Sequence, residues 1–320
     1  MKLLGAFLRL VRWPNLLFIA LTQFSFYYFI LLPSFHGGQP AGFENVLKPR
    51  EFYLLCLSSL LIAAAGYIIN DYFDLTIDRV NKPEKIVVEK VIKRRWTIIW
   101  QWIFSGIGIV LGFYISWKLH NILIGLSNVL CVALLWFYST VFKKKLLIGN
   151  IIISLLSAWV ILVLYLCEFR FHRFTDPAYH QSLSRVYKFA ILYAAFAFII
   201  SLVREVIKDI EDMEGDSRYG CRTMAVVWGV NVSKVFAATW LIVLVSSLLV
   251  VQVYVLQYRW WGSVLYVMIF VILPLLKIFR NLYTASAVED YHHLSTLVKA
   301  VMFTGILSMV FFKLYTSWIP

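Results

Sequence analysis

The run EFYLLCLSSLLIAAAGYIINDYF at residues 51–73 decides the fold. It is an almost uninterrupted apolar stretch, and a transmembrane helix needs about 20 mostly apolar residues. The same pattern recurs outward from it in both directions, near residues 13–33, 97–117, 120–142, 147–168, 186–207, 235–256, 260–282 and 297–318. These runs do not alternate as barrel strands do. We therefore predict an all-α, multi-pass transmembrane bundle of about nine helices around a central cavity, built as one domain over residues 1–320.

The composition agrees with a membrane protein. Of the 320 residues, 61% are hydrophobic and only 15% are charged, yet the net charge is +13. So few charges exclude a disordered chain and a single water-soluble domain. If the N-terminus is cytoplasmic, most Lys and Arg residues fall on the cytoplasmic side, as the positive-inside rule requires. We expect the plasma membrane of a prokaryote, an active site facing the cytoplasm and no nucleic-acid partner.

Six of the 17 acidic residues form two groups with the same spacing of three and then four. The first group is Asn70, Asp71, Asp74 and Asp78, and the second is Asp209, Asp212 and Asp216. On one helix this spacing would place the carboxylates on a single face, where they repel. A cation must offset this repulsion, and Mg²⁺ is usually held by one or two carboxylates together with substrate phosphates. We predict that both groups bind Mg²⁺ and a diphosphate, and that their six aspartates are catalytic.

Basic and aromatic residues lie beside both groups. Direct cation contacts to a diphosphate strengthen as the leaving group gains charge. The diphosphate-binding candidates are Arg79, Lys85, Tyr138, Lys143, Lys144, Lys208 and Arg222. Aromatic faces stabilise a carbocation, so Tyr67 is a candidate for the wall of a prenyl cavity.

These residues resemble the UbiA superfamily of intramembrane prenyltransferases. The segment NDYFDLTIDRVNKP at 70–83 is similar to its first aspartate motif, and REVIKDIEDMEGDSRYGCRT at 204–223 to its second. The segment YSTVFKKKLLIGN at 138–150 is similar to its Tyr–Lys element. The spacing there is five rather than four, which leaves open whether Lys143 or Lys144 points inward. Lys85 stands where an arginine is common, which keeps the charge but loses the bidentate fork.

The resemblance implies a Mg²⁺-dependent prenyltransferase with a polyprenyl diphosphate donor and a lipid or small-molecule acceptor. Arg12 and Asn15, in the segment LVRWPNLLFIALTQ at 10–23, are acceptor-side candidates. Their pattern favours a geranylgeranylglyceryl phosphate-type acceptor, while a quinone precursor of the 4-hydroxybenzoate or naphthoate type stays open. An ion or solute transporter is the alternative from a different class, because acids within a membrane also bind ions.

Overall fold

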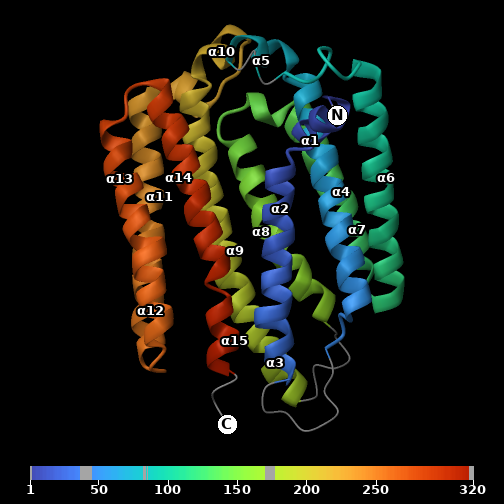
Figure 1. Cartoon of the computed structure of the whole chain (residues 1–320), viewed down its shortest axis with the longest axis vertical. Coiled ribbons are helices and arrows are strands. Elements are labelled where there is room, and N and C mark those ends of the chain that lie inside the picture. The colour runs from blue at the N-terminus through green and yellow to red at the C-terminus, as the bar shows by residue number, and fades with distance from the viewer. Residues whose placement is uncertain (1, 37–44, 82–83, 85, 170–176, 317–320) are drawn as a thin grey trace.

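The computed structural model describes residues 2–36, 45–81, 84, 86–169 and 177–316, whose regular structure is helical throughout (Figure 1). Nine helical runs within these residues are long and apolar enough to cross a membrane, as predicted. Single helices form six of them: α4 (Pro49–Phe73), α6 (Arg94–Leu119), α7 (Ile122–Thr140), α8 (Ile148–Glu168), α9 (Pro177–Glu211) and α11 (Met224–Leu256). The other three are α2 (Trp13–Phe26) with η1 (Tyr27–Leu31) and α3 (Leu32–His36), α12 (Trp261–Val267) with η4 (Met268–Ile272) and α13 (Leu273–Thr284), and α14 (Val288–Leu307) with α15 (Val310–Thr316).

Several helices extend beyond their predicted ends, and the sixth and seventh do so toward each other. The sixth was expected over 186–207, but α9 has 35 residues and continues to Glu211. The seventh was expected from residue 235, but α11 begins at Met224 and passes through a kink at Gly229, where φ is 83°. The polar segment predicted between them is therefore mostly helical. Hydropathy detects only the part of a helix that lies in the hydrocarbon, whereas backbone hydrogen bonding continues into the charged ends.

Two membrane-spanning runs contain a π-helix, and in each case a proline follows. Pro33 comes after η1, and Pro274 comes after η4. Proline has no N–H to donate, and its ring clashes with the carbonyl four residues earlier. The wider π turn accommodates this clash without ending the helix.

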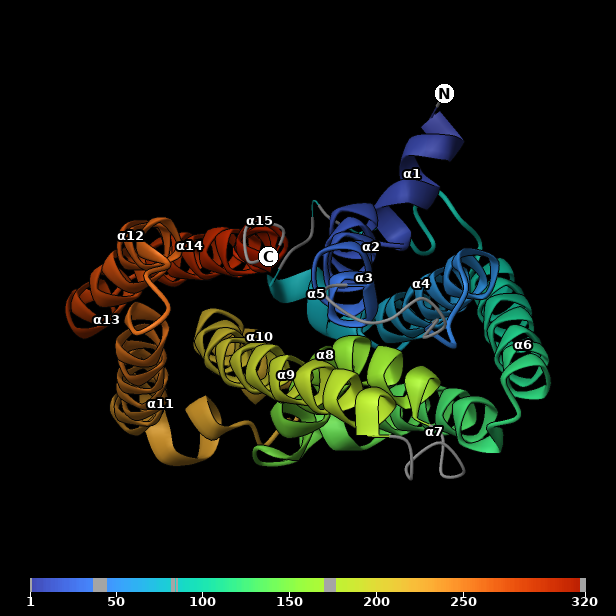
Figure 2. The same ribbon diagram turned by 90° about the horizontal axis from the view of Figure 1, so that it is seen from below.

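The membrane-spanning helices form a ring, which is visible from below in Figure 2. Helix α9 packs against α8, α11 and α14, so it contacts both halves of the chain. An apolar core around α9, α11, α13 and α14 includes Ile200, Val203 and Leu275. This packing fixes the end of α9 close to the end of α4.

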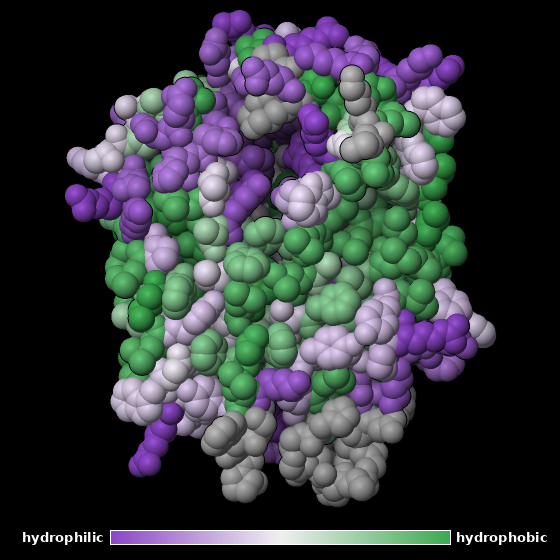
Figure 3. Space-filling view, viewed as in Figure 1, coloured by the Kyte–Doolittle hydropathy of each residue, from purple (hydrophilic) through white to green (hydrophobic). Residues whose placement is uncertain are grey.

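Four short helices gather at one end of the ring: α1 (Lys2–Leu10), α5 (Leu75–Asn81), η2 (Phe142–Lys144) and α10 (Met213–Arg218). Figure 1 has α1, α5 and α10 at the top, with the C-terminal end of the chain at the bottom. Hydrophilic residues concentrate at the same end in Figure 3, and a hollow with hydrophilic side chains lies just below it, between α14 and α2. Both aspartate groups lie at this end.

Candidate active site

The first aspartate group lies on a bend between two helices. Helix α4 ends at Phe73, Asp74 caps it with φ −81° and ψ −5°, and α5 begins at Leu75. The backbone N–H of Asp78 still donates to the carbonyl oxygen of Asp74 at 2.8 Å. The prediction of a single helix face is therefore wrong, because the chain turns at the middle aspartate.

The second aspartate group repeats this bend. Helix α9 ends at Glu211, Asp212 follows with φ −95° and ψ 4°, and α10 begins at Met213. The backbone N–H of Asp216 donates to the carbonyl oxygen of Asp212 at 3.1 Å. Two segments that are far apart in the sequence thus have the same spacing and the same local geometry.

Asn81 holds the two bends together. Its side-chain Nδ2 donates to the carbonyl oxygen of Asp212 at 3.0 Å, and its Oδ1 accepts from the backbone N–H of Gly215 at 2.9 Å. A Cβ atom on Gly215 would lie only 2.3 Å from that Oδ1. Residue 215 therefore has room only for glycine, and α5 is fixed directly against α10.

Two cations pair with the first bend. Arg12 donates from Nη2 to Asp71 at 2.6 Å, and the Lys143 ammonium forms an ion pair with Asp74. Burial alone would lower the pKa of each cation, but the Asp71 and Asp74 carboxylates raise the pKa of Arg12 and of Lys143 above their usual values. Both cations therefore stay charged at physiological pH.

The third carboxyl of the first bend, Asp78, is affected mainly by burial. Burial raises the pKa of Asp78 to about 6, and the nearby charge of Asp74 adds to the shift. An ionised Asp78 is thus less stable than an ordinary surface aspartate. A divalent cation beside it would favour the ionised form.

The turn after α7 decides which lysine faces the first bend. Helix α7 ends at Thr140, η2 follows, and Leu147 has a φ of 57° that redirects the chain into α8. Lys143 is half-buried and reaches Asp74, while Lys144 is exposed. The carbonyl oxygen of Lys144 accepts from the backbone N–H of Arg222 at 2.9 Å, so that residue ties η2 to the segment after α10.

Asp209 of the second bend has a neutral partner. Asn150, on the first turn of α8, donates from Nδ2 to Asp209 at 2.8 Å. Among the described residues no cation forms an ion pair with Asp209. The Asn150 amide orients this carboxylate without cancelling its charge.

The oxygen atoms at the two bends fit a magnesium ion. The Oδ1 atom of Asn70 is buried and has no hydrogen-bond partner in the described structure, while its Nδ2 donates to Asp74 at 2.6 Å. An amide oxygen beside carboxylates is a donor set that Mg²⁺ prefers. Within the described residues, no three His, Cys, Asp or Glu side chains are close enough to hold a metal by themselves. Phosphate oxygens or water would have to complete the coordination.

The residues predicted near the acceptor lie next to the first bend. The Arg12 guanidinium lies over the Tyr67 ring, 5.3 Å from its centroid, and also contacts Asp71. Asn15 lies within hydrogen-bonding reach of the Tyr67 hydroxyl. Tyr138 lies within electrostatic range of Lys143, Asp74 and Asp209. The two tyrosines therefore both lie near the charged groups.

A sequence model of the UbiA prenyltransferase family matches residues 30–307. The chain belongs to this family. It is an integral, multi-pass membrane protein of the prenyltransferase class, as its nine membrane-spanning runs require. The match includes both aspartate bends, the Tyr138–Lys143 element and the membrane-spanning runs, except for most of the first run and α15 at the end of the ninth.

Several relatives of the chain share the name digeranylgeranylglyceryl phosphate synthase. The digeranylgeranylglyceryl phosphate synthase of Methanothermobacter thermautotrophicus is 32% identical over 210 residues, which cover 64% of this chain and 66% of that protein, just under two thirds. The synthase of the same name from Methanosphaera stadtmanae is 27% identical over 261 residues, which cover 81% of this chain and 86% of that protein.

Solved structures share the fold. A structure described as digeranylgeranylglyceryl phosphate synthase in membranes has a TM-score of 0.61 and 22% identity, covering 97% of this chain and 99% of that one. A UbiA homologue from Archaeoglobus fulgidus, bound to DMAPP and Mg²⁺, has a TM-score of 0.56 and 17% identity, covering 94% and 99%.

Some predicted family residues lie away from the bends. Arg79 is exposed and pairs with Glu89 at 2.9 Å, and the Arg222 side chain is exposed as well. Lys208 is not one of these, because it approaches Glu205 at 3.7 Å and lies within electrostatic range of Asp209. Lys85 lies outside the described residues.

Neither Asn81 nor Asn150 was predicted from the sequence as a site residue. Each is a single amide side chain, so no spacing or charge pattern marks it. The only signal was position, because both lie within a few residues of a recognised motif.

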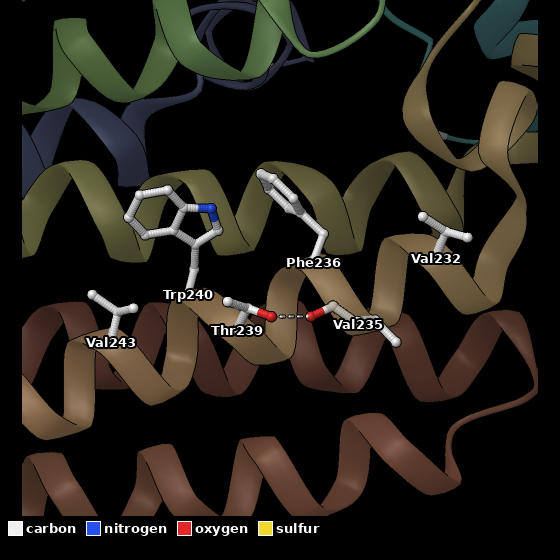
Figure 4. Close-up of a pocket in the computed structure, with 6 residues that line it drawn as sticks. All are labelled: Val232, Val235, Phe236, Thr239, Trp240 and Val243. Carbon is white, nitrogen blue, oxygen red and sulfur yellow. Dashed lines mark hydrogen bonds between the residues drawn. The ribbon is translucent and has the colours of Figure 1, made fainter.

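An apolar groove on α11 is separate from this site. It has a volume of about 400 Å³ and is lined by residues of one helix, Val232, Val235, Phe236, Thr239, Trp240 and Val243 (Figure 4). The Thr239 hydroxyl donates to the carbonyl oxygen of Val235, on its own helix, at 2.9 Å. The groove thus offers no carboxylate, cation or thiol for catalysis, and it suits contact with lipid.

Proposed function

We propose that this chain transfers a polyprenyl group from a polyprenyl diphosphate to a glycerophosphate lipid, with Mg²⁺ bound between the two aspartate bends. The observation that carries the proposal is the pair of matching bends joined by Asn81. The family membership and the Mg²⁺ and prenyl diphosphate bound to a fold relative support it.

The names of the relatives support the choice of acceptor. Their product, digeranylgeranylglyceryl phosphate, carries two geranylgeranyl groups. A prenyl transfer that makes this product needs an acceptor that already carries one such group. We therefore favour a geranylgeranylglyceryl phosphate-type acceptor over a quinone precursor.

The side chains at the bends bind and orient the donor. Asn70, Asp71, Asp74 and Asp78 would hold metal at the first bend, and Asp209, Asp212 and Asp216 at the second. Bound Mg²⁺ supplies positive charge that stabilises a departing diphosphate. Lys143 is positioned to add a direct contact to the same group.

The reaction exchanges one carbon–oxygen bond for another. The allylic carbon–oxygen bond of the donor breaks, and its electron pair leaves with the diphosphate. The acceptor hydroxyl oxygen then bonds to the allylic carbon and gives up its proton at the aqueous end of the site. The faces of Tyr67 and Tyr138 would stabilise the positive charge on the prenyl chain while it is kept from water.

The charged end is proposed to face the cytoplasm of a prokaryotic cell. The excess of Lys and Arg at this end supports that orientation. Cysteines placed at Ser217 and at Gln181, in a variant whose four native cysteines are replaced, test it. Ser217Cys should resist a membrane-impermeant maleimide in intact cells, and Gln181Cys should react. The reverse pattern would require the opposite orientation.

The activity is tested with the purified chain in nanodiscs. We expect Mg²⁺-dependent formation of a diprenylated glycerophosphate from geranylgeranyl diphosphate and geranylgeranylglyceryl phosphate, detected by mass spectrometry. Prenylation of 4-hydroxybenzoate in its place would make the acceptor assignment wrong. Ion flux into liposomes without any product would favour a transporter.

A further inference from the structure

A second group of charged residues lies on α9, in the two turns before the second bend. Arg204 donates to Glu205 at 2.9 Å, and Lys208 reaches the other oxygen of Glu205 at 3.7 Å. The side chains of Arg204 and Glu205 are only 16% and 12% exposed. The Nε atom of Arg204 is buried and has no hydrogen-bond partner in the described structure. Burying a hydrogen-bond donor without a partner costs free energy. The Arg204 guanidinium can therefore donate a further hydrogen bond to a ligand.

Helix α14 adds a further cation to this group. Lys299 is half-buried on α14, which packs against both α9 and α2. Its ammonium lies close enough to Arg204, Lys208 and Arg12 to be repelled by them, and close enough to Glu205 to be attracted by it. Among the described residues, Lys299 has neither an ion pair nor a hydrogen bond. A lysine within a membrane helix is costly, and burial beside like charges raises that cost unless an anion binds.

Lys299 is on α14 and Arg12 directly precedes α2, and a hollow with hydrophilic side chains lies between these two helices (Figure 3). Tyr67 is within electrostatic range of both Arg12 and Arg204, and the Arg12 guanidinium lies over its ring. Further along the same helices, Phe18 and Phe303 meet edge to face at 6.1 Å. Lys299 and Arg12 therefore lie on or beside the same pair of helices as this apolar contact.

We propose that Lys299, Arg204 and Arg12 bind the phosphate monoester of the acceptor lipid. This inference rests on the proposed function, because it names the subsite that selects the acceptor. A phosphate monoester carries a charge of about −1.5 to −2 near pH 7 and has three strong acceptor oxygens. Arginine forks match such a group, and Lys299 adds a point charge. The diphosphate of the donor binds at the bends and Lys143, so each anionic group has its own cations.

The geometry also explains how the two substrates would be aligned. Arg12 contacts Asp71 through Nη2 and has further N–H groups for a phosphate. It therefore connects the metal-binding side to the proposed phosphate subsite. A lipid held here by its phosphate would direct its glycerol toward the bends.

The test compares Lys299→Gln with Lys299→Arg and with Lys277→Gln as a matched control. Lys277 is an exposed lysine on the neighbouring α13. Steady-state kinetics in nanodiscs would use geranylgeranyl diphosphate with two acceptors, geranylgeranylglyceryl phosphate and the same lipid without its phosphate. Thermal unfolding with and without the phosphorylated acceptor provides a second readout.

For Lys299→Gln we expect the KM for the phosphorylated acceptor to rise about tenfold or more. The KM for the donor should change by less than twofold, and turnover of the acceptor without phosphate should not change. Lys299→Arg should recover most of the loss, and Lys277→Gln should behave as wild type. Without substrate, Lys299→Gln should unfold at the same temperature or a higher one, because it removes a repelled cation.

The subsite is disproved if Lys299→Gln leaves the acceptor KM unchanged, or if it raises the KM of donor and acceptor together. It is equally disproved if the variant loses the same activity toward the acceptor without phosphate. A wild-type protein that prenylates neither glycerolipid contradicts the proposed function instead, so the two failures are distinguishable.

Discussion

The two aspartate bends share a spacing and a backbone geometry but differ in their partners. At the first bend, Arg12 and Lys143 pair with Asp71 and Asp74. At the second, Asp209 is oriented by the uncharged Asn150. The first bend therefore combines metal-binding oxygens with cations, whereas the Asp209 carboxylate has an amide as its hydrogen-bond partner.

This difference indicates that the bends contribute unequally to binding the donor. Lys143 beside the first bend can contact a diphosphate directly, so substitutions there should affect the donor and the metal together. Substitutions around Asp209 should act mainly on the metal. The sequence repeat alone hides this asymmetry, because it shows only the aspartates.

The largest effect is expected when either middle aspartate is removed. Asp74→Ala or Asp212→Ala should lower kcat/KM by at least about a thousandfold, roughly 4 kcal/mol, because each bend loses a charged ligand. Labelled-prenyl transfer by the purified variants measures this. Glu289→Ala, which removes an exposed carboxylate on α14, is the control. Near wild-type turnover in either aspartate variant would mean that its bend is not part of the active site.

A smaller effect separates the two lysines near the first bend. Lys143→Gln should lower kcat/KM about a hundredfold, since it removes a charge-assisted contact to the leaving group. Lys144→Gln should cost less than twofold, because that side chain is exposed. Lys143→Arg should recover part of the activity. Equal losses for the two glutamine variants would contradict the position of Lys143 described above.

A metal-specific effect is expected at the second bend. Asn150→Ala removes the amide that orients Asp209, and partners that orient metal ligands are worth about 10–100-fold in metal affinity. The Mg²⁺ concentration for half-maximal activity should therefore rise about tenfold, with the donor KM at saturating Mg²⁺ nearly unchanged. Asn231→Ala, at an exposed asparagine on α11, is the control. A change in donor KM without a change in Mg²⁺ dependence would remove the asymmetry between the bends.

The smallest effect concerns the connection between the bends. Gly215→Ala places a Cβ against the Asn81 side chain and should destabilise the fold by about 1–3 kcal/mol. Asn81→Ala removes the obstruction, so the double variant should be more stable than additivity predicts, by about 1 kcal/mol. Thermal unfolding of the single and double variants measures this coupling. Strictly additive values would show that Asn81 does not hold the bends together.

The sequence was enough to predict the fold and to locate the two groups of aspartates. Hydropathy marked all nine membrane-spanning runs, because an apolar helix of sufficient length is unambiguous in this composition. The spacing of three and four marked both bends. It could not reveal the turn at Asp74 or Asp212, since the backbone hydrogen bonds continue through each turn.

The partners of the aspartates were harder to predict. The choice of Lys143 over Lys144 depends on the end of α7 and on the left-handed Leu147, neither of which hydropathy reports. Arg79 was expected at the diphosphate, but it turns to Glu89 on the neighbouring loop. Lys299 was not predicted as a site residue. Its closeness to Arg204 depends on how α14 packs against α9, which the sequence does not show.

Because α9 is so long, the thickness of the surrounding bilayer should affect the geometry of the site. The 35 residues of α9 extend about 52 Å, well beyond a hydrocarbon core of about 30 Å. The same helix carries Arg204, Lys208 and Asp209, so any tilt that relieves hydrophobic mismatch moves them together against α4 and α14. The catalytic rate should consequently vary with the acyl-chain length of the bilayer, with an optimum at the thickness that leaves α9 in register with its neighbours.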